Sequence, residues 1–194
     1  MGNRNVRWLK LAAFVLAYGA YRLKVLTPNG TVAAFLLGTF IFGIGGIPWM
    51  VPLAIFFLLS SLLSKLGGAK KITVELLYEK SSNRDMLQVL ANGGVAGLLA
   101  ISWHFTSLDV LYYAFLGSLA AATADTWGTE IGVLSRRPPR NILNFRPVAM
   151  GTSGGITLVG TSGAALGSGV LTLSGWFVPI SAPDPLFHSP VFFS

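Results

Sequence analysis

The chain has 194 residues, of which 53% are hydrophobic and 11% are charged, and its mean hydropathy is +0.65. A soluble domain usually carries about 25% charged residues, so this composition excludes a soluble globular protein. The formal net charge of +7 could indicate nucleic-acid binding, but the basic residues stand in short loops beside apolar segments, and we expect no nucleic-acid partner.

Long apolar blocks decide the class of protein. Several of them approach the roughly 20 residues that a helix needs to cross a bilayer core. Because backbone groups in lipid must find hydrogen bonds within their own segment, such blocks indicate helices. We therefore expect an all-α fold, an integral, polytopic bundle of about six transmembrane helices, in the plasma membrane if the source is prokaryotic. The expected segments are 6–26, 31–47, 49–66, 86–105, 108–134 and 156–180.

The amino-terminal segment has two interpretations. Arg4, Arg7 and Lys10 precede a short apolar run, 11–21, which resembles a secretory signal peptide. The tyrosines and basic residues that follow could instead reach the membrane interface, and we expect a first helix. Residues 1–180 then form one transmembrane domain, and the Pro-rich residues 181–194 form a tail.

Turn-forming residues separate the next segments. Pro28, Asn29 and Gly30 predict a turn between the first and second helices. The stretch 43–48, which is rich in glycine and ends in a proline, predicts a break between the second and third helices.

The distribution of basic residues predicts the orientation in the membrane. With the amino terminus outside, eleven Lys and Arg residues fall on one side of the membrane and three on the other. Because basic residues concentrate in cytoplasmic loops, we expect the loops 67–85 and 135–150 in the cytoplasm. We also expect Trp49, Trp103 and Trp176 to lie in an aromatic belt at the membrane interfaces.

The fifth segment carries two carboxylates near its cytoplasmic end, Asp125 and Glu130. At about 100° per residue they share a sector of about 140° with Thr126 and Thr129. A carboxylate within a span costs roughly 2.5–3.5 kcal/mol, so each one needs a compensating partner. One interpretation is that arginines neutralise both acids. The other is that both are catalytic ligands of Mg²⁺, which takes one or two carboxylates together with substrate phosphates.

A second polar face opens the fourth segment. Arg84, Gln88 and Asn92 follow i, i+4, i+8 spacing and therefore share one face. Gln88 and Asn92 could simply form hydrogen bonds between helices. The Arg84 guanidinium suits bidentate phosphate binding, so we take Arg84 as a catalytic candidate and Gln88 and Asn92 as cofactor-binding candidates.

A Gly-rich stretch precedes the last segment and consists of Gly151, Thr152, Ser153, Gly154 and Gly155. Glycine lets the backbone approach a ligand closely, and the start of the following helix offers N–H groups to an anion. A simple turn or close helix packing would give the same string. All of these polar groups fall on the predicted cytoplasmic side, which favours a phosphate-bearing substrate bound there.

Several motifs together resemble one family of membrane proteins. They are 24–27 with Gly30, the run 56–65, 82–85, 88–92, the block 124–135 with its Ala-Asp-Thr-Trp-Gly-Thr-Glu sequence, and the block 151–155. The family is the one that contains transmembrane protein nineteen and plant phytyl-phosphate kinase, and the resemblance covers roughly residues 20–170. Members usually continue with further helices past the sixth span, so the resemblance implies that the family's C-terminal helices are missing here.

The resemblance implies a kinase-like transferase that phosphorylates an isoprenoid (phytyl or polyprenyl) monophosphate with CTP or ATP. Asp125 and Glu130 would hold Mg²⁺ or nucleotide phosphate, Arg84 would contact phosphate, and Thr152 and Ser153 would cradle it. Two alternatives stay open: a lipid cytidylyltransferase that shares the site, and a transporter or non-catalytic membrane protein. The expected partners are membrane lipid and the isoprenoid phosphate, and a homo-oligomeric state stays open.

Overall fold

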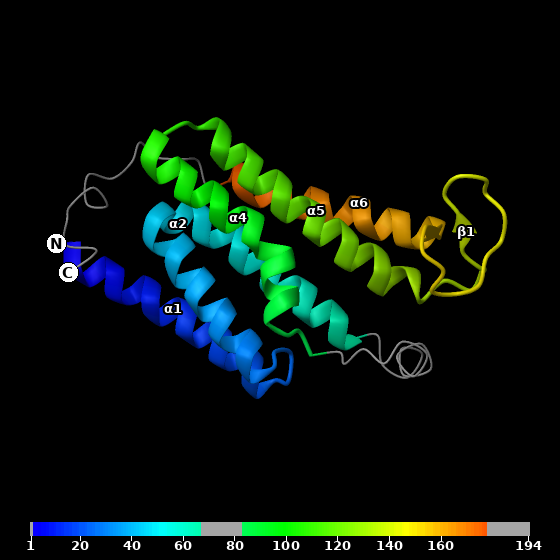
Figure 1. The fold of residues 1–194 in the computed structure, drawn as a ribbon, viewed down its shortest axis with the longest axis horizontal. Helices are drawn as coiled ribbons and strands as arrows, with labels where there is room; N and C mark the ends of the chain where they lie inside the picture. Colours follow the sequence, from blue (N-terminus) through cyan, green and yellow to red (C-terminus); the bar gives the residue numbers. More distant parts are fainter. Residues whose placement is uncertain (1, 67–82, 178–194) are drawn as a thin grey trace.

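The structure is a computed structural model, and it describes residues 2–66 and 83–177. This part of the chain consists mostly of helices, with one short antiparallel sheet. The elements are α1 (Gly2–Arg22), α2 (Pro28–Leu66), α4 (Met86–Thr106), α5 (Val110–Gly132), β1 (Arg140–Asn141), β2 (Gly155–Ile156) and α6 (Leu158–Trp176). Figure 1 shows an elongated bundle in which successive helical segments run alternately in opposite directions.

The predicted second and third helices form one element, α2, which is sharply kinked at Gly46. This residue has φ 64° and ψ −152°, a backbone conformation that glycine adopts without the steric cost of a Cβ. The two arms of α2 lie on either side of the kink, and Figure 1 shows them running back along each other. The break predicted within 43–48 is therefore confirmed.

The other predicted helices are confirmed, but their first and last residues differ from the predicted ones. α1 ends at Arg22, four residues before the predicted 26, because the chain turns there into a short loop that pairs with Arg84. The all-α prediction is wrong in one respect, since β1 and β2 pair with Arg140 opposite Ile156 and Asn141 opposite Gly155. Most of the predicted loop 67–85 and the whole tail 181–194 lie outside the described residues.

Many large apolar side chains lie on the outside of the bundle, and small residues form some of the helix contacts. Leu98 of α4 is 65% exposed and Leu158 of α6 is 81% exposed. On α1 the buried residues are Ala13, Ala17 and Ala20, which lie on one face of the helix. Such a distribution would aggregate in water, but it is expected when the surrounding medium is lipid and small residues let helices approach.

Two helices in the described part of the chain are long and apolar enough to cross a membrane, Pro28–Lys65 and Met86–Thr106. The first of these holds the kink at Gly46, so it comprises two arms. The predicted number of about six transmembrane helices stays a prediction, as does the cytoplasmic placement of the two loops.

An aromatic cluster fills the core at the end of the bundle where α2 is kinked. The ring of Trp49 lies 5.3 Å from that of Trp103 and 4.5 Å from that of Phe115, and all three side chains are buried. Tyr112 joins them and donates a hydrogen bond of 3.2 Å to the carbonyl of Pro48. The Trp49 and Trp103 rings therefore pack against neighbouring helices, and their predicted level at the membrane interfaces stays a prediction.

Glycines allow α5 and α6 to pack in close contact. A Cβ at Gly160 would stand 2.7 Å from the carbonyl oxygen of Gly128, and one at Gly163 would stand 2.7 Å from the Ile131 side chain. Because the carbonyl oxygen of Gly128 belongs to the backbone, it cannot move aside unless the two helices separate. This packing sets the position of the polar end of α5 relative to the loop before α6.

We expect Gly160→Ala to lower the thermal unfolding midpoint of the purified protein in detergent, because the added methyl group forces the α5 and α6 backbones apart. Overpacking of this kind costs about 1–3 kcal/mol. Gly169→Ala is the matched control on α6, since a Cβ there meets nothing within 4 Å and the helix gains about 1 kcal/mol of propensity. Equal midpoints for the two variants would contradict the close packing.

Candidate active site

The backbone of Arg84 is fixed by the loop between α1 and α2. The Arg84 amide donates to the Val25 carbonyl at 2.9 Å, and the Thr27 amide donates to the Arg84 carbonyl at 3.1 Å. Leu26 and Arg84 thereby form a parallel bridge. The close approach requires glycine at position 30, where a Cβ would collide with the Arg84 carbonyl oxygen. Arg84 therefore stands at a fixed position just before α4.

The side chain of Arg84 is buried between the ends of two other helices. Its Nη2 atom donates to the Ser64 hydroxyl, on the last turn of α2, at 3.4 Å. Ser64 in turn donates to Oε1 of Glu130, on the last turn of α5, at 2.8 Å. We call these three residues the Arg84 cluster. They link the α1–α2 loop, α2, α4 and α5 at one end of the bundle.

Electrostatics explains why the three residues occur together. Burial lowers the pKa of the Arg84 guanidinium from its usual value, and the charge of Glu130 opposes that shift. An arginine keeps its proton in proteins, so the cluster contains a buried cation with a carboxylate beside it. A buried charge without such compensation would be strongly destabilising.

A cleft of about 630 Å³ opens on another face of α5. Asp125 and Thr129, one turn apart on α5, line it together with the start of α6 and the loop that joins the two helices. Gly151, Thr152 and Gly154 contribute from that loop. The structure thus brings together two motifs that stand more than twenty residues apart in the sequence.

The loop over the cleft has a conformation that needs its glycines. Gly151 has φ 84° and Gly154 has φ 75°, both in the region that side chains disfavour. The strands β1 and β2 close the base of the loop, and the Gly155 amide donates to the Thr152 carbonyl at 3.0 Å. At the start of α6, Thr157 accepts a capping bond from the Gly160 amide. The Gly-rich segment is therefore a shaped turn beside a helix N-terminus.

The two predicted metal ligands face different surroundings. Asp125 is exposed and lines the cleft, whereas Glu130 is partly buried and belongs to the Arg84 cluster. Within the described ranges no three His, Cys, Asp or Glu side chains come together as a metal site. A joint role of Asp125 and Glu130 on one ion stays a prediction.

The other predicted site residues also lie in different surroundings. Asn92 and Arg84 line a second, smaller cavity, described below. Gln88 and Ser153 are not among the residues that line these two cavities. The backbone N–H of Gln88 donates at 2.9 Å to the carboxylate of Asp85, which caps α4. Sequence reasoning missed Ser64, although its i, i+4 spacing from Ser60 on an apolar helix was a signal.

The fold and these cavities define an integral membrane helical protein whose polar groups gather at one end of the bundle. The chain belongs to the family described as integral membrane protein DUF92, whose model matches residues 11–192. The resemblance noticed in the sequence is thus confirmed. No solved structure matches the chain.

Relatives from plants and archaea support this membership. The chain is 36% identical over 169 residues to Protein PGR of Arabidopsis thaliana, which covers 80% of this chain and 58% of that protein. It is 32% identical over 164 residues to an uncharacterized membrane protein, MJ0933, of Methanocaldococcus jannaschii, which covers 84% and 67%. It is 28% identical over 167 residues to Protein VTE6, chloroplastic, of Arabidopsis thaliana, covering 82% and 50%. The chain therefore spans about half to two thirds of these relatives' lengths.

We expect a double-mutant cycle of Arg84→Gln and Glu130→Gln to give a coupling free energy of about 0.5–2 kcal/mol, because each charge compensates the other. Unfolding of the four proteins in mixed micelles measures it. The control cycle pairs Arg84→Gln with Asp125→Asn, which should be additive because Asp125 faces the cleft. Additive effects in both cycles would show that the charges of Arg84 and Glu130 do not stabilise each other.

Proposed function

We propose that this protein is a membrane-embedded phosphotransferase that adds a phosphoryl group from a nucleoside triphosphate to an isoprenoid monophosphate. The observation that carries the proposal is the cleft in which Asp125 and Thr129 face the Gly-rich loop. Membership of the membrane family supports it. The substrate class comes from the resemblance to the family of plant phytyl-phosphate kinase.

The donor set of the cleft suits Mg²⁺. This ion is usually held by one or two carboxylates together with substrate phosphates and water. Asp125 supplies an exposed carboxylate and Thr129 a hydroxyl one turn away, in a cleft whose volume of about 630 Å³ falls within the usual range of small-molecule sites. When bound there, Mg²⁺ would offset the negative charge of the triphosphate.

The loop would hold the triphosphate itself. Gly151 and Gly154 bring the backbone close to the cleft without side chains in the way, and Thr152 adds a hydroxyl. The N-terminus of α6 lies at the same cleft through Thr157 and Gly160, and helix N-termini favour anions. Nucleotide phosphates are thus expected between Asp125 and this loop.

The acceptor phosphate would lie toward Arg84. In the proposed reaction one of its oxygens attacks the γ-phosphorus, the bond from that phosphorus to the bridging oxygen breaks, and the nucleoside diphosphate leaves with those electrons. A guanidinium binds phosphate in bidentate geometry. Thr129 lines the cleft and its neighbour Glu130 belongs to the Arg84 cluster, so the two proposed phosphate sites adjoin the same turn of α5.

We expect Asp125→Asn to lower the turnover of farnesyl monophosphate to farnesyl diphosphate by at least about 100-fold, because the loss of one preorganised electrostatic contact commonly has this effect. Mass spectrometry of the lipid product, with ATP or CTP and Mg²⁺ in nanodiscs, measures it. Asp109→Asn is the matched control, since Asp109 is exposed at the opposite end of α5 and makes no side-chain capping bond.

The product distinguishes this proposal from its alternatives. A nucleoside diphosphate and a lipid diphosphate support the phosphotransferase, whereas pyrophosphate and a cytidylylated lipid would identify a cytidylyltransferase. Full turnover in Asp125→Asn would show that the cleft around Asp125 is not the active site. The absence of any product from the wild-type protein would favour the non-catalytic alternative.

We also expect Mg²⁺ together with ATP or CTP to raise the thermal unfolding midpoint of the wild-type protein. A ligand at 100 times its Kd adds about 2.7 kcal/mol to the free energy of unfolding. Asp125→Asn should lose most of the Mg²⁺-dependent part of this shift and Asp109→Asn should keep it. A shift that does not depend on Asp125 would mean that the nucleotide binds elsewhere.

A further inference from the structure

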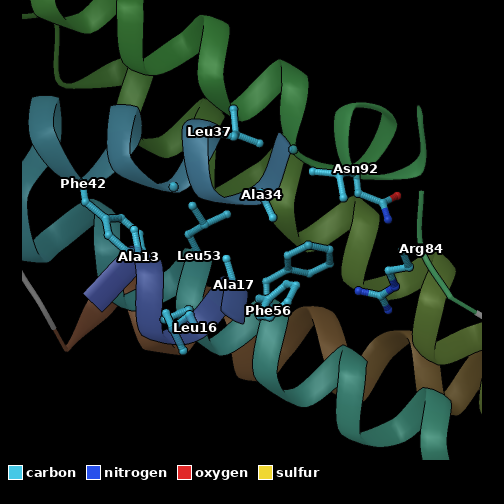
Figure 2. Close-up of a pocket in the computed structure, with 15 residues that line it drawn as sticks. Ala13, Leu16, Ala17, Ala34, Leu37, Phe42, Leu53, Phe56, Arg84 and Asn92 are labelled. Atoms are coloured by element: carbon cyan, nitrogen blue, oxygen red, sulfur yellow. The ribbon is translucent and has the colours of Figure 1, made fainter. Parts of the chain in front are cut away.

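A second cavity, of about 70 Å³, lies between α1, the two arms of α2 and α4. Its walls are almost entirely apolar, with Leu37, Phe42, Leu53 and Phe56 from the two arms of α2. Figure 2 shows that the polar side chains of Arg84 and Asn92 lie together at one end, while the apolar residues extend away from them. The cavity is therefore amphipathic along its length.

We propose that this cavity binds the isoprene unit next to the phosphate of a prenyl monophosphate, with Arg84 and Asn92 toward the phosphate. The proposal rests on the proposed function for the substrate class and adds the place and the part of the lipid that is recognised. A cationic guanidinium at one end of an apolar cavity matches an anionic head group on a hydrocarbon chain.

The size of the cavity limits which part of the chain it holds. A water-sized group needs about 10–15 Å³ of such volume, so 70 Å³ corresponds to roughly five to seven carbon-sized groups. This is about one five-carbon isoprene unit. The rest of a long chain would continue into the bilayer, which the outer apolar side chains of α1 and α4, such as Phe14 and Leu90, face.

The shape of the walls favours a branched chain over a straight one. Small residues from three helical segments, Ala17, Ala34 and Ala54, stand among the large side chains of the lining. A methyl branch can pack against these small residues and bury its apolar surface, whereas an unbranched acyl chain has no branch to place there. The occupant is therefore an isoprenoid and not an ordinary membrane acyl chain.

The test measures binding without nucleotide or Mg²⁺, so that it does not depend on catalysis. Three probes are compared in nanodiscs: farnesyl monophosphate, dodecyl phosphate, which has the same main-chain length without branches, and farnesol, which lacks the phosphate. The dissociation constant of farnesyl monophosphate should be the lowest of the three, by about tenfold. Ala34→Leu, which fills the cavity, should raise it at least about tenfold.

Ala33→Leu is the matched control, because Ala33 is the adjacent residue of α2 and does not line the cavity. This variant should bind farnesyl monophosphate with a dissociation constant within about twofold of the wild-type value. Ala54→Leu fills the same space from the other arm of α2 and serves if Ala34→Leu does not fold. Equal affinity for dodecyl phosphate, or unchanged affinity in both filled variants, would overturn the proposal.

Turnover measured on the same variants keeps the two proposals separate. If the filled variants bind farnesyl monophosphate and turn it over like the wild type, the cavity assignment falls and the phosphotransferase stands. If the wild type binds the lipid with the predicted dependence on Ala34 but forms no lipid diphosphate, the cavity assignment stands and the phosphotransferase falls.

Discussion

The polar end of the bundle depends on the compensation of one buried positive charge, that of Arg84. Its backbone is held by the α1–α2 loop, and its side chain reaches Ser64 and, through it, Glu130. Because an uncompensated charge is so costly in a low-dielectric interior, these partners must approach together. The same requirement therefore fixes the ends of α2, α4 and α5 relative to one another, and with them the positions of both cavities.

Much of the fold follows from the sequence because lipid leaves the backbone few choices. Apolar blocks have to be helices, and Gly46 stands within the stretch where a break was predicted. The strands β1 and β2 were not predictable, since two residues each carry no alternation of apolar and polar side chains. The burial of Trp49 was not predictable, because it depends on Trp103 and Phe115, which come from other helices.

Helical periodicity predicts which polar residues of α5 share a face, and no more of the site than that. The spacing on α5 separates Asp125 with Thr129 from Thr126 with Glu130, by angle alone. Tertiary packing decides what each of these two pairs faces. The glycines of α6 bring the loop before α6 close to Asp125 and Thr129, and Ser64 reaches Glu130. The spacing of Ser60 and Ser64 was a signal that did not point to a site by itself, since serine is common where membrane helices pack.

The two acids that the sequence places on one helix have different surroundings in the structure. Glu130 has the charge of Arg84 nearby, which is the neutralised state considered from the sequence. No arginine is among the residues that line the cleft around Asp125, so that interpretation does not extend to it. A carboxylate within a membrane-spanning helix needs water or a cation to offset its cost. Asp125 therefore lies where the proposed function needs an accessible carboxylate, while Glu130 lies beside the guanidinium that lines the apolar cavity.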